Sequence, residues 1–226
     1  MPALLGIDIG TTSTIGILID TEGRTLATAS RPADLLSPEA SWAEEDPAQW
    51  WSNTRAVIAE LLGETGLAGA DIAAIGTTGM VPALVLLGAE GRVLRRSMQQ
   101  NDARALAEID EMGRRVDPAG FLAATGGSVN QQIAAPKLRW LQRHEPEVFA
   151  RIATIFGSYD YITYRLSGAR SVDHNWALES GLMDIGRREF TPALLAEAGI
   201  APALLPPNFS TRSPCRAAPA TKAEAT

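Results

Sequence analysis

The first chemically suggestive feature is a single acid followed by small hydroxyl residues, placed between two apolar runs near the N-terminus. The apolar run over residues 4–9 leads into Asp8-Ile9-Gly10-Thr11-Thr12-Ser13, and a second apolar run covers residues 14–19. Backbone N–H groups and short hydroxyls at the tip of a hairpin can crowd close to phosphate oxygens. Asp8 could hold Mg²⁺ directly or through water, because this ion prefers carboxylate and phosphate oxygens. The pattern predicts a phosphate-binding hairpin, and a tight turn at Gly10 and Thr11 without a ligand is the plainer alternative.

A second polar cluster, Gln99-Gln100-Asn101-Asp102 with Arg104 beyond it, follows an expected strand. Planar amides and carboxylates bind polyols well, because they donate and accept hydrogen bonds at the same time. Asn101 or Asp102 could instead cap a helix that starts here. Four such groups in succession exceed what one cap needs, so we expect a site for sugar hydroxyls.

The elements that would position both clusters can be read from the apolar periodicity. Strands are expected at residues 4–9, 14–19, 25–30, 71–76, 83–87, 92–94 and 152–156, with a loop at 77–82 after the fourth. Helices are expected from Asp46-Pro47 to about residue 63 or 66, and at residues 103–116, 134–143 and 159–166. A meander of hairpins followed by alternating helices and strands predicts an α/β fold, with flanking helices on a mixed β-sheet. This is the order of a ribonuclease H-like domain.

Composition excludes several classes of protein. The chain has 226 residues, 46% of them hydrophobic, and a net charge of −6 with scattered basic residues, which argues against nucleic acid as a partner. No apolar stretch approaches ~20 residues, so no membrane partner is expected. Cys215 is the single cysteine, which rules out an internal disulfide and favours a reducing, cytoplasmic location.

The hairpin at residues 8–13 resembles the first phosphate-binding motif of the actin, Hsp70 and sugar-kinase superfamily. From about residue 4 to residue 207, the chain resembles the N-terminal domain of FGGY carbohydrate kinases, the family of xylulokinase, ribulokinase and glycerol kinase. The pieces that carry this resemblance occur in the family's order, at residues 8–13, 76–80, 101–104, 135–141, 159–168, 173–181 and 194–207.

The resemblance implies transfer of the γ-phosphoryl group of ATP to a hydroxyl of a sugar or polyol, with Mg²⁺ present. Such a reaction depends on positioning and on neutralising charge. The implied ATP and Mg²⁺ contacts are Asp8, Gly10, Thr11, Thr12 and Ser13, with Asp8 nearest the metal. The implied sugar contacts are Thr78, Gly79, Met80, Gln100, Asn101, Asp102, Arg104 and Gln132, with Asn130 close by. A homodimer stays open as a further partner.

The chain departs from the family pattern at its expected sugar pocket. Val81-Pro82 stand where xylulokinase-like members carry Met-His and glycerol kinases carry Arg-Glu. Gln100 stands where many members have tryptophan, and Gln131-Gln132 lie near the place of a tyrosine in glycerol kinases. The expected pocket therefore offers amides in place of the histidine or arginine of those relatives. This disfavours glycerol and D-xylulose as substrates, and a pentulose, another ketose or a polyol remains open.

Family members are usually longer, with a second ribonuclease H-like domain whose Gly-rich turn carries the catalytic base. We therefore expect residues 1–207 to form the sugar-binding domain and residues 208–226 to be a linker towards a second domain, and we assign no catalytic residue. One alternative is a non-catalytic sugar-binding or regulatory module with the same fold. Another is an actin-like or Hsp70-like ATPase that shares only the hairpin motif. The segments at 101–104 and 135–141 argue against it, because they match the sugar side of the kinase pattern.

Overall fold

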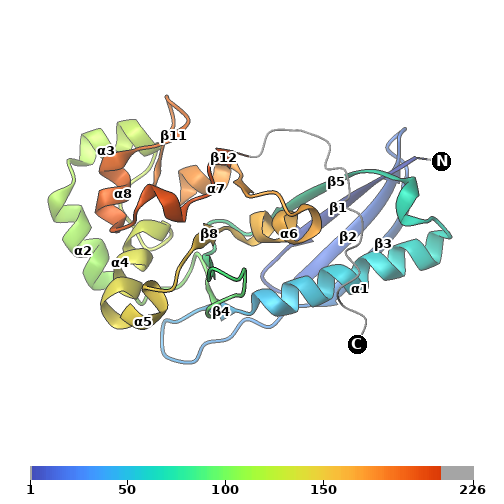
Figure 1. Ribbon diagram of the computed structural model, residues 1–226, viewed down its shortest axis with the longest axis horizontal. Coiled ribbons are helices and arrows are strands. Elements are labelled where there is room, and N and C mark those ends of the chain that lie inside the picture. The colour runs from blue at the N-terminus through green and yellow to red at the C-terminus, as the bar shows by residue number, and fades with distance from the viewer. Residues whose placement is uncertain (1, 210–226) are drawn as a thin grey trace.

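The computed structural model describes residues 2–209, and a four-stranded sheet forms one end of it (Figure 1). Its strands are β1 (Ala3–Ile9), β2 (Ser13–Asp20), β3 (Thr25–Pro32) and β5 (Ile72–Gly79), in the spatial order β3-β2-β1-β5. β2 pairs antiparallel with both β1 and β3, whereas β5 pairs parallel with β1. The predicted meander and the predicted mixed sheet are confirmed.

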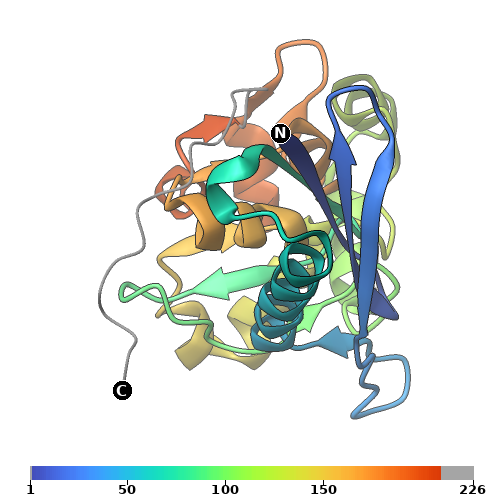
Figure 2. The same ribbon diagram turned by 90° about the vertical axis from the view of Figure 1, so that its right-hand side faces the viewer.

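Helix α1 (Pro47–Thr65) lies along the sheet and packs against β2 and β3. It begins as the sequence predicts, because the Asp46 side chain accepts a hydrogen bond from the N–H of Ala48 (2.9 Å) and Pro47 follows. It ends at Gly66, which adopts the left-handed conformation (φ 69°) that favours glycine. Helix α6 (Ser158–Ser167) contacts α1, β1 and β5, so both helices lie on the same side of the sheet (Figure 2).

Gly16 on β2 lets α1 approach the sheet closely. A Cβ atom at this position would lie 2.2 Å from Val57 Cγ1 and 2.9 Å from Leu61 Cδ1, both on buried side chains of α1. We expect Gly16→Ala to lower the free energy of unfolding by about 1–3 kcal/mol, because the two elements would have to move apart. Gly76→Ala on β5 is the matched control, since nothing lies within 4 Å of its added Cβ. Chemical denaturation of both variants tests this, and equal stability of the two would contradict the close packing.

The other end of the molecule is mainly helical (Figure 1). The helices there and between the two ends are α2 (Leu106–Arg115), α3 (Pro118–Thr125), α4 (Ala134–His144), α5 (Pro146–Phe149), α7 (His174–Glu179) and α8 (Pro192–Ala198). Short two-stranded sheets lie among these helices. β4 (Glu44–Glu45) pairs with β7 (Ser97–Met98), and β6 (Val85–Leu87) pairs with β8 (Thr154–Phe156). β9 (Ser171–Val172) pairs with β12 (Asn208–Phe209), and β10 (Met183–Asp184) pairs with β11 (Glu189–Phe190). Two single-turn 3₁₀ helices lie at Gly69–Asp71 and Pro202–Leu204.

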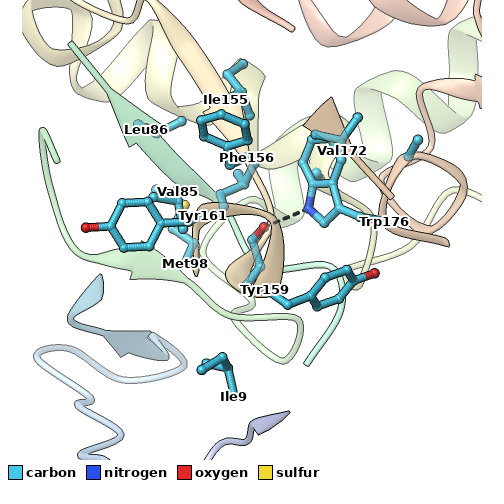
Figure 3. Close-up of a cluster of buried hydrophobic side chains, with 14 of the residues drawn as sticks. Ile9, Val85, Leu86, Met98, Ile155, Phe156, Tyr159, Tyr161, Val172 and Trp176 are labelled. Atoms are coloured by element: carbon cyan, nitrogen blue, oxygen red, sulfur yellow. Dashed lines mark hydrogen bonds between the residues drawn. The ribbon is translucent and has the colours of Figure 1, made fainter. Parts of the chain in front are cut away.

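A buried apolar cluster joins the end of β1 to β6, β8, α6 and α7 (Figure 3). Ile9, Phe156 and Trp176 are fully buried in it. The indole N–H of Trp176 donates to the carbonyl of Ala83 (2.9 Å), the hydrogen bond drawn in Figure 3. This bond matches the rule that a buried tryptophan finds an acceptor for its one polar atom. The cluster fixes the end of the sheet at which the Asp8 hairpin lies.

Three predicted boundaries are wrong. The fourth strand does not end at residue 76, because the ladder between β5 and β1 continues through Gly79. Residues 92–94 form no strand, since only Val93 makes an isolated bridge, to Leu87. The helix predicted at 103–116 starts at Leu106 without a side-chain cap, so neither Asn101 nor Asp102 caps it. The N–H of Ala103 instead donates to the carbonyl of Ser41 (2.9 Å), which holds residues 101–105 outside the helix.

The sequence reading also missed four short helices. α3, α5 and α8 each carry proline at the first position, and α3 and α8 are capped by Asp117 and Thr191. α7 is capped by Asp173. These start signals are visible in the sequence, but four to eight residues are too few to show an apolar period.

The predicted domain boundary at residue 207 stays a prediction. Residues 208 and 209 form β12, and the rest of the predicted linker, with Cys215, lies outside the described residues. In the part of the chain that the structure describes, every helix is too short or too polar to cross a bilayer.

Candidate functional site

The turn between β1 and β2 is a tight hairpin, as the sequence predicts, and phosphate binding by its backbone N–H groups and hydroxyls stays a prediction. The N–H of Gly10 donates to the carbonyl of Ser13 (3.0 Å), and the carbonyl of Thr12 accepts from the N–H of Ala33 (2.9 Å). A Cβ atom at Gly10 would lie 3.1 Å from the carbonyl oxygen of Ser13 and 3.5 Å from the Asp8 carboxylate. A side chain at residue 10 would therefore crowd the Ser13 carbonyl, so glycine suits this tight turn, in which Thr12 is exposed.

The parallel pairing of β1 with β5 brings the first predicted sugar segment to this hairpin. Asp8 lies opposite Thr78 and Ile9 opposite Gly79, and the N–H of Met80 donates to the carbonyl of Ile9 (3.0 Å). A Cβ atom at Gly79 would lie only 2.7 Å from the carbonyl oxygen of Ile9. Thr78, Gly79 and Met80 are thus placed beside Asp8, with strand rather than loop conformation up to Gly79.

The Asp8 side chain fits a role in holding Mg²⁺. It is half-buried. Within residues 2–209 its carboxylate accepts no hydrogen bond, whereas the carboxylates of Asp20, Asp46 and Asp102 each accept at least one. In those residues no group of three or more Asp, Glu, His or Cys side chains could form a metal cage. Mg²⁺ at nucleotide sites usually takes only one or two carboxylates together with phosphate oxygens. One free carboxylate at a donor-rich turn meets that requirement.

The second predicted sugar segment is a tight turn directly after β7. The N–H of Asp102 donates to the carbonyl of Gln99 (3.1 Å), which leaves Gln100 and Asn101 at the tip of the turn. Both tip side chains are exposed, whereas Gln99 is buried. The N–H of Gln99 also donates to the carbonyl of Ala43 (3.0 Å), so the turn is attached to the segment before α1.

Asp102 and Arg104 lie inside the protein and bind each other. The Asp102 carboxylate accepts hydrogen bonds from Arg104 Nε (2.8 Å) and from the N–H of Ala43 (2.7 Å), and the Arg104 side chain is only 1% exposed. Burial tends to raise the pKa of Asp102, but the hydrogen bonds from Arg104 and Ala43 outweigh it and hold the pKa below its usual value. In this segment the side chains that face solvent are Gln100 and Asn101, and sugar contacts from Asp102 and Arg104 stay predictions.

The sequence reading missed the partners that bury this arginine. Glu145, Arg95, Glu44, Arg104 and Asp102 form a line of alternating charges, which we call the buried charge chain. Glu44 is its centre, because one carboxylate oxygen accepts from both Arg95 and Arg104. The Arg104 guanidinium also lies 3.6 Å from the ring centroid of Trp42 and 5.1 Å from that of Trp140. Apart from Asp102–Arg104, these pairs join residues far apart in the chain, so no local pattern indicates them.

Glu45, next to Glu44, is buried without a cation. One carboxylate oxygen accepts from the indole N–H of Trp50 (2.8 Å), and among the described residues the other has no partner. Burial raises the pKa of Glu45 to about 7, and the Trp50 hydrogen bond only partly offsets this. Ser97, directly opposite Glu45 in the β4–β7 pair, also has a buried hydroxyl with no described partner.

We expect Glu45→Gln to stabilise the protein at alkaline pH. A folded-state pKa of about 7, above the usual 4.5, means that the parent loses stability as pH rises through 7. From that difference, the parent should lose about 2 kcal/mol more than Glu45→Gln between pH 5.5 and pH 8.5. Urea denaturation at both pH values measures this, and parallel pH dependence of the two proteins would contradict it.

Gln132 lies apart from the Asp8 hairpin in sequence and is exposed in the loop before α4. Its N–H donates to the side-chain oxygen of Asn130 (2.7 Å). Both residues line a pocket of about 310 Å³, whose other lining residues include Ser128, Glu179 and Gly181. The predicted segment at residues 130–132 thus faces a pocket of mixed polar and apolar lining, with Glu179 as a carboxylate that the sequence reading did not select.

Comparison with known proteins gives one consistent result. The N-terminal domain of the FGGY family of carbohydrate kinases matches residues 3–225. Xylulose kinase of Escherichia coli (strain K12) is 32% identical over 191 residues, which cover 84% of this chain and 39% of that protein. Glycerol kinase of Nocardia farcinica (strain IFM 10152) is 33% identical over 205 residues, which cover 88% of this chain and 41% of that protein.

The solved structures agree with these matches. A crystal structure of xylulose kinase from Rhodospirillum rubrum superposes with a TM-score of 0.87 at 50% identity, over 92% of this chain and 43% of that one. Xylulose kinase from Brucella ovis gives a TM-score of 0.85 at 32% identity. These neighbours confirm the expected ribonuclease H-like α/β fold. The chain spans about two fifths of the length of these relatives.

Proposed function

The chain belongs to the FGGY family of carbohydrate kinases, and from this we propose that it supplies the sugar-binding half and the first phosphate motif of an ATP-dependent sugar kinase. The proposed reaction transfers the γ-phosphoryl group of ATP to a hydroxyl of a sugar or polyol. One observation supports the proposal. The β1–β5 pairing sets the Asp8 hairpin beside Thr78–Met80, so the proposed phosphate site and the proposed hydroxyl-binding segment would lie at the same end of the sheet.

At this edge, Asp8 would hold Mg²⁺, and Gly10, Thr11, Thr12 and Ser13 would lie near the phosphates. Bound Mg²⁺ would neutralise charge on the phosphate oxygens during transfer. The chain's own contribution is to orient: the Gly10–Ser13 hydrogen bond shapes the turn, and the free Asp8 carboxylate supplies a hard oxygen ligand.

We assign no catalytic base in this chain. A general base must reach the hydroxyl that it deprotonates and must be able to accept its proton. Asp102 does not meet the second condition, because it is fully buried against Arg104 and its pKa is held low. We therefore propose that the base lies in the part of the kinase that corresponds to the rest of the relatives' length.

For the substrate we propose a pentulose or a related ketose. Xylulose kinases are prominent among the relatives, whereas Val81-Pro82 and Gln100 supply no imidazole, guanidinium or indole at the expected pocket. The exposed amides of Gln100, Asn101 and Gln132 suit several adjacent hydroxyls, because each amide can donate and accept.

The test is ADP release from MgATP by the polypeptide that the complete reading frame encodes, against a panel of pentuloses, hexuloses and polyols. We expect turnover that depends on one ketose or a small group of ketoses. ATP hydrolysis at the same rate with and without every sugar, or no turnover from folded protein, would contradict the proposal. Sugar binding without any turnover would favour the non-catalytic sugar-binding module instead.

A further inference from the structure

Lys137 on α4 is a buried cation that the proposed site has not yet used. Only 1% of its surface is exposed, although lysine is almost never fully buried unless it is paired. Burial lowers the pKa of its ammonium group to about 8; nearby Asp102 opposes this shift and Arg104 adds to it. An arrangement that keeps an ammonium group out of water needs strong acceptors at short range.

The acceptors are two consecutive backbone carbonyls of the turn after β7. Lys137 Nζ lies 2.6 Å from the carbonyl oxygen of Gln99 and 3.1 Å from that of Gln100. Neighbouring carbonyls point in opposite directions in an extended strand, so a single ammonium group reaches both only when the chain turns. The Gln99 carbonyl also accepts the hydrogen bond from Asp102 N–H that closes the turn (3.1 Å).

Lys137 therefore fixes the turn from the inside, and the exposed side chains lie on its outer side. Gln100 and Asn101 project into solvent at the tip, whereas Gln99 and Asp102 at the two ends are buried. The buried charge chain holds the Asp102 end through Arg104. At the Gln99 end, the residue's N–H bonds the Ala43 carbonyl, and the ammonium group holds its carbonyl together with the tip carbonyl of Gln100.

From this geometry we infer that Lys137 is a positioning residue for sugar recognition, which sets the backbone from which Gln100 and Asn101 meet sugar hydroxyls. This inference rests on the proposed function and deepens it, since it assigns a role to a residue that never touches the substrate. Loss of the ammonium group removes one hydrogen bond from each of two carbonyls and loosens the turn, so binding of sugar weakens while binding of ATP at the Asp8 hairpin does not.

The test uses Lys137→Met, Lys137→Arg and a matched control, Arg139→Met. Arg139 is also a cation on α4 that donates to backbone carbonyls, but to those of Glu197 (2.8 Å) and Ala196 (2.6 Å) in α8, not to the turn. In the 226-residue chain, amide hydrogen exchange at Asp102 reports the turn. We expect exchange there to be at least tenfold faster in Lys137→Met, and unchanged in Arg139→Met at equal global stability.

In the complete gene product, Lys137→Met should raise KM for the sugar at least tenfold while KM for ATP stays constant. Lys137→Arg should recover part of the loss, because it restores a cation at the carbonyls. Unchanged exchange at Asp102 in Lys137→Met would overturn the inference, as would an equal rise in both KM values. If the parent phosphorylates no sugar, the proposed function fails, and the exchange measurement still decides whether Lys137 holds the turn.

Discussion

Replacing Glu44 with glutamine is expected to lower the free energy of unfolding by about 3–5 kcal/mol, the usual effect of removing one partner from a buried ion pair. Glu44 is only 5% exposed and stands between two arginines whose side chains are 11% and 1% exposed. Glutamine keeps the shape and one acceptor oxygen but removes the negative charge. Arg95 would then depend on Glu145 alone, and Arg104 on Asp102 alone.

The adjacent residue provides an internal control with the opposite sign. Glu45→Gln makes the same chemical change one residue further on. The Glu45 carboxyl is buried, and among residues 2–209 it has no cation beside it. At pH 8 we expect Glu44→Gln to be less stable than the parent and Glu45→Gln to be more stable, by thermal or urea unfolding. A Glu44→Gln variant as stable as the parent would contradict the role of Glu44 in the buried charge chain, and a Glu45→Gln variant less stable than the parent would contradict the raised pKa of Glu45.

The second large effect is expected at the hairpin. Asp8→Asn should reduce the kcat of sugar phosphorylation by the complete gene product by roughly 10²-fold or more, the scale seen when one preorganised electrostatic group is lost. Asparagine retains an oxygen but loses the charge that favours Mg²⁺. Stability should change little, because in the described chain the Asp8 carboxylate supports no side-chain hydrogen bond, unlike Asp20 with its bonds to Glu22 and Arg24.

Asp34→Asn is the matched control for this experiment. Asp34 follows Ala33, which bonds to Thr12 of the hairpin, but its exposed carboxylate is engaged with the side chain of Gln49 (2.8 Å). Steady-state kinetics at saturating and limiting Mg²⁺ should show that Asp8→Asn needs a higher Mg²⁺ concentration than the parent. The Mg²⁺ requirement of Asp34→Asn should equal that of the parent. Equal Mg²⁺ dependence of the two variants would rule out Asp8 as the metal-holding residue.

Much of the fold follows from local sequence, because the relevant signals lie within a few residues. The apolar runs at residues 4–9 and 14–19 predict the strands found at Ala3–Ile9 and Ser13–Asp20, and Asp46-Pro47 marks the start of α1. The end of β5 could not be predicted in the same way. Gly79 and its neighbours look like a loop in the sequence, and only the ladder with β1 keeps them extended.

The candidate site likewise has one part that local sequence predicts and one part that depends on distant residues. The hairpin at Asp8 is a local motif, and it folds as predicted. The turn at residues 99–102 looks like a row of four binding groups, yet long-range partners decide which of them are exposed. Asp102 is turned inward by Ala43, 59 positions earlier, as well as by the neighbouring Arg104, and the Gln99 carbonyl binds Lys137, 38 positions later. Such pairs depend on tertiary packing, which no local pattern reveals.

The measurement that tests the central claim most directly is titration calorimetry of the 226-residue chain with the ketose that the complete gene product phosphorylates, with ADP release followed in the same samples after MgATP is added. The account predicts that the folded chain binds this sugar and releases no ADP. ADP release by the chain alone would show that the catalytic base lies within these residues. Absence of sugar binding by the folded chain would show that these residues are not the sugar-binding half.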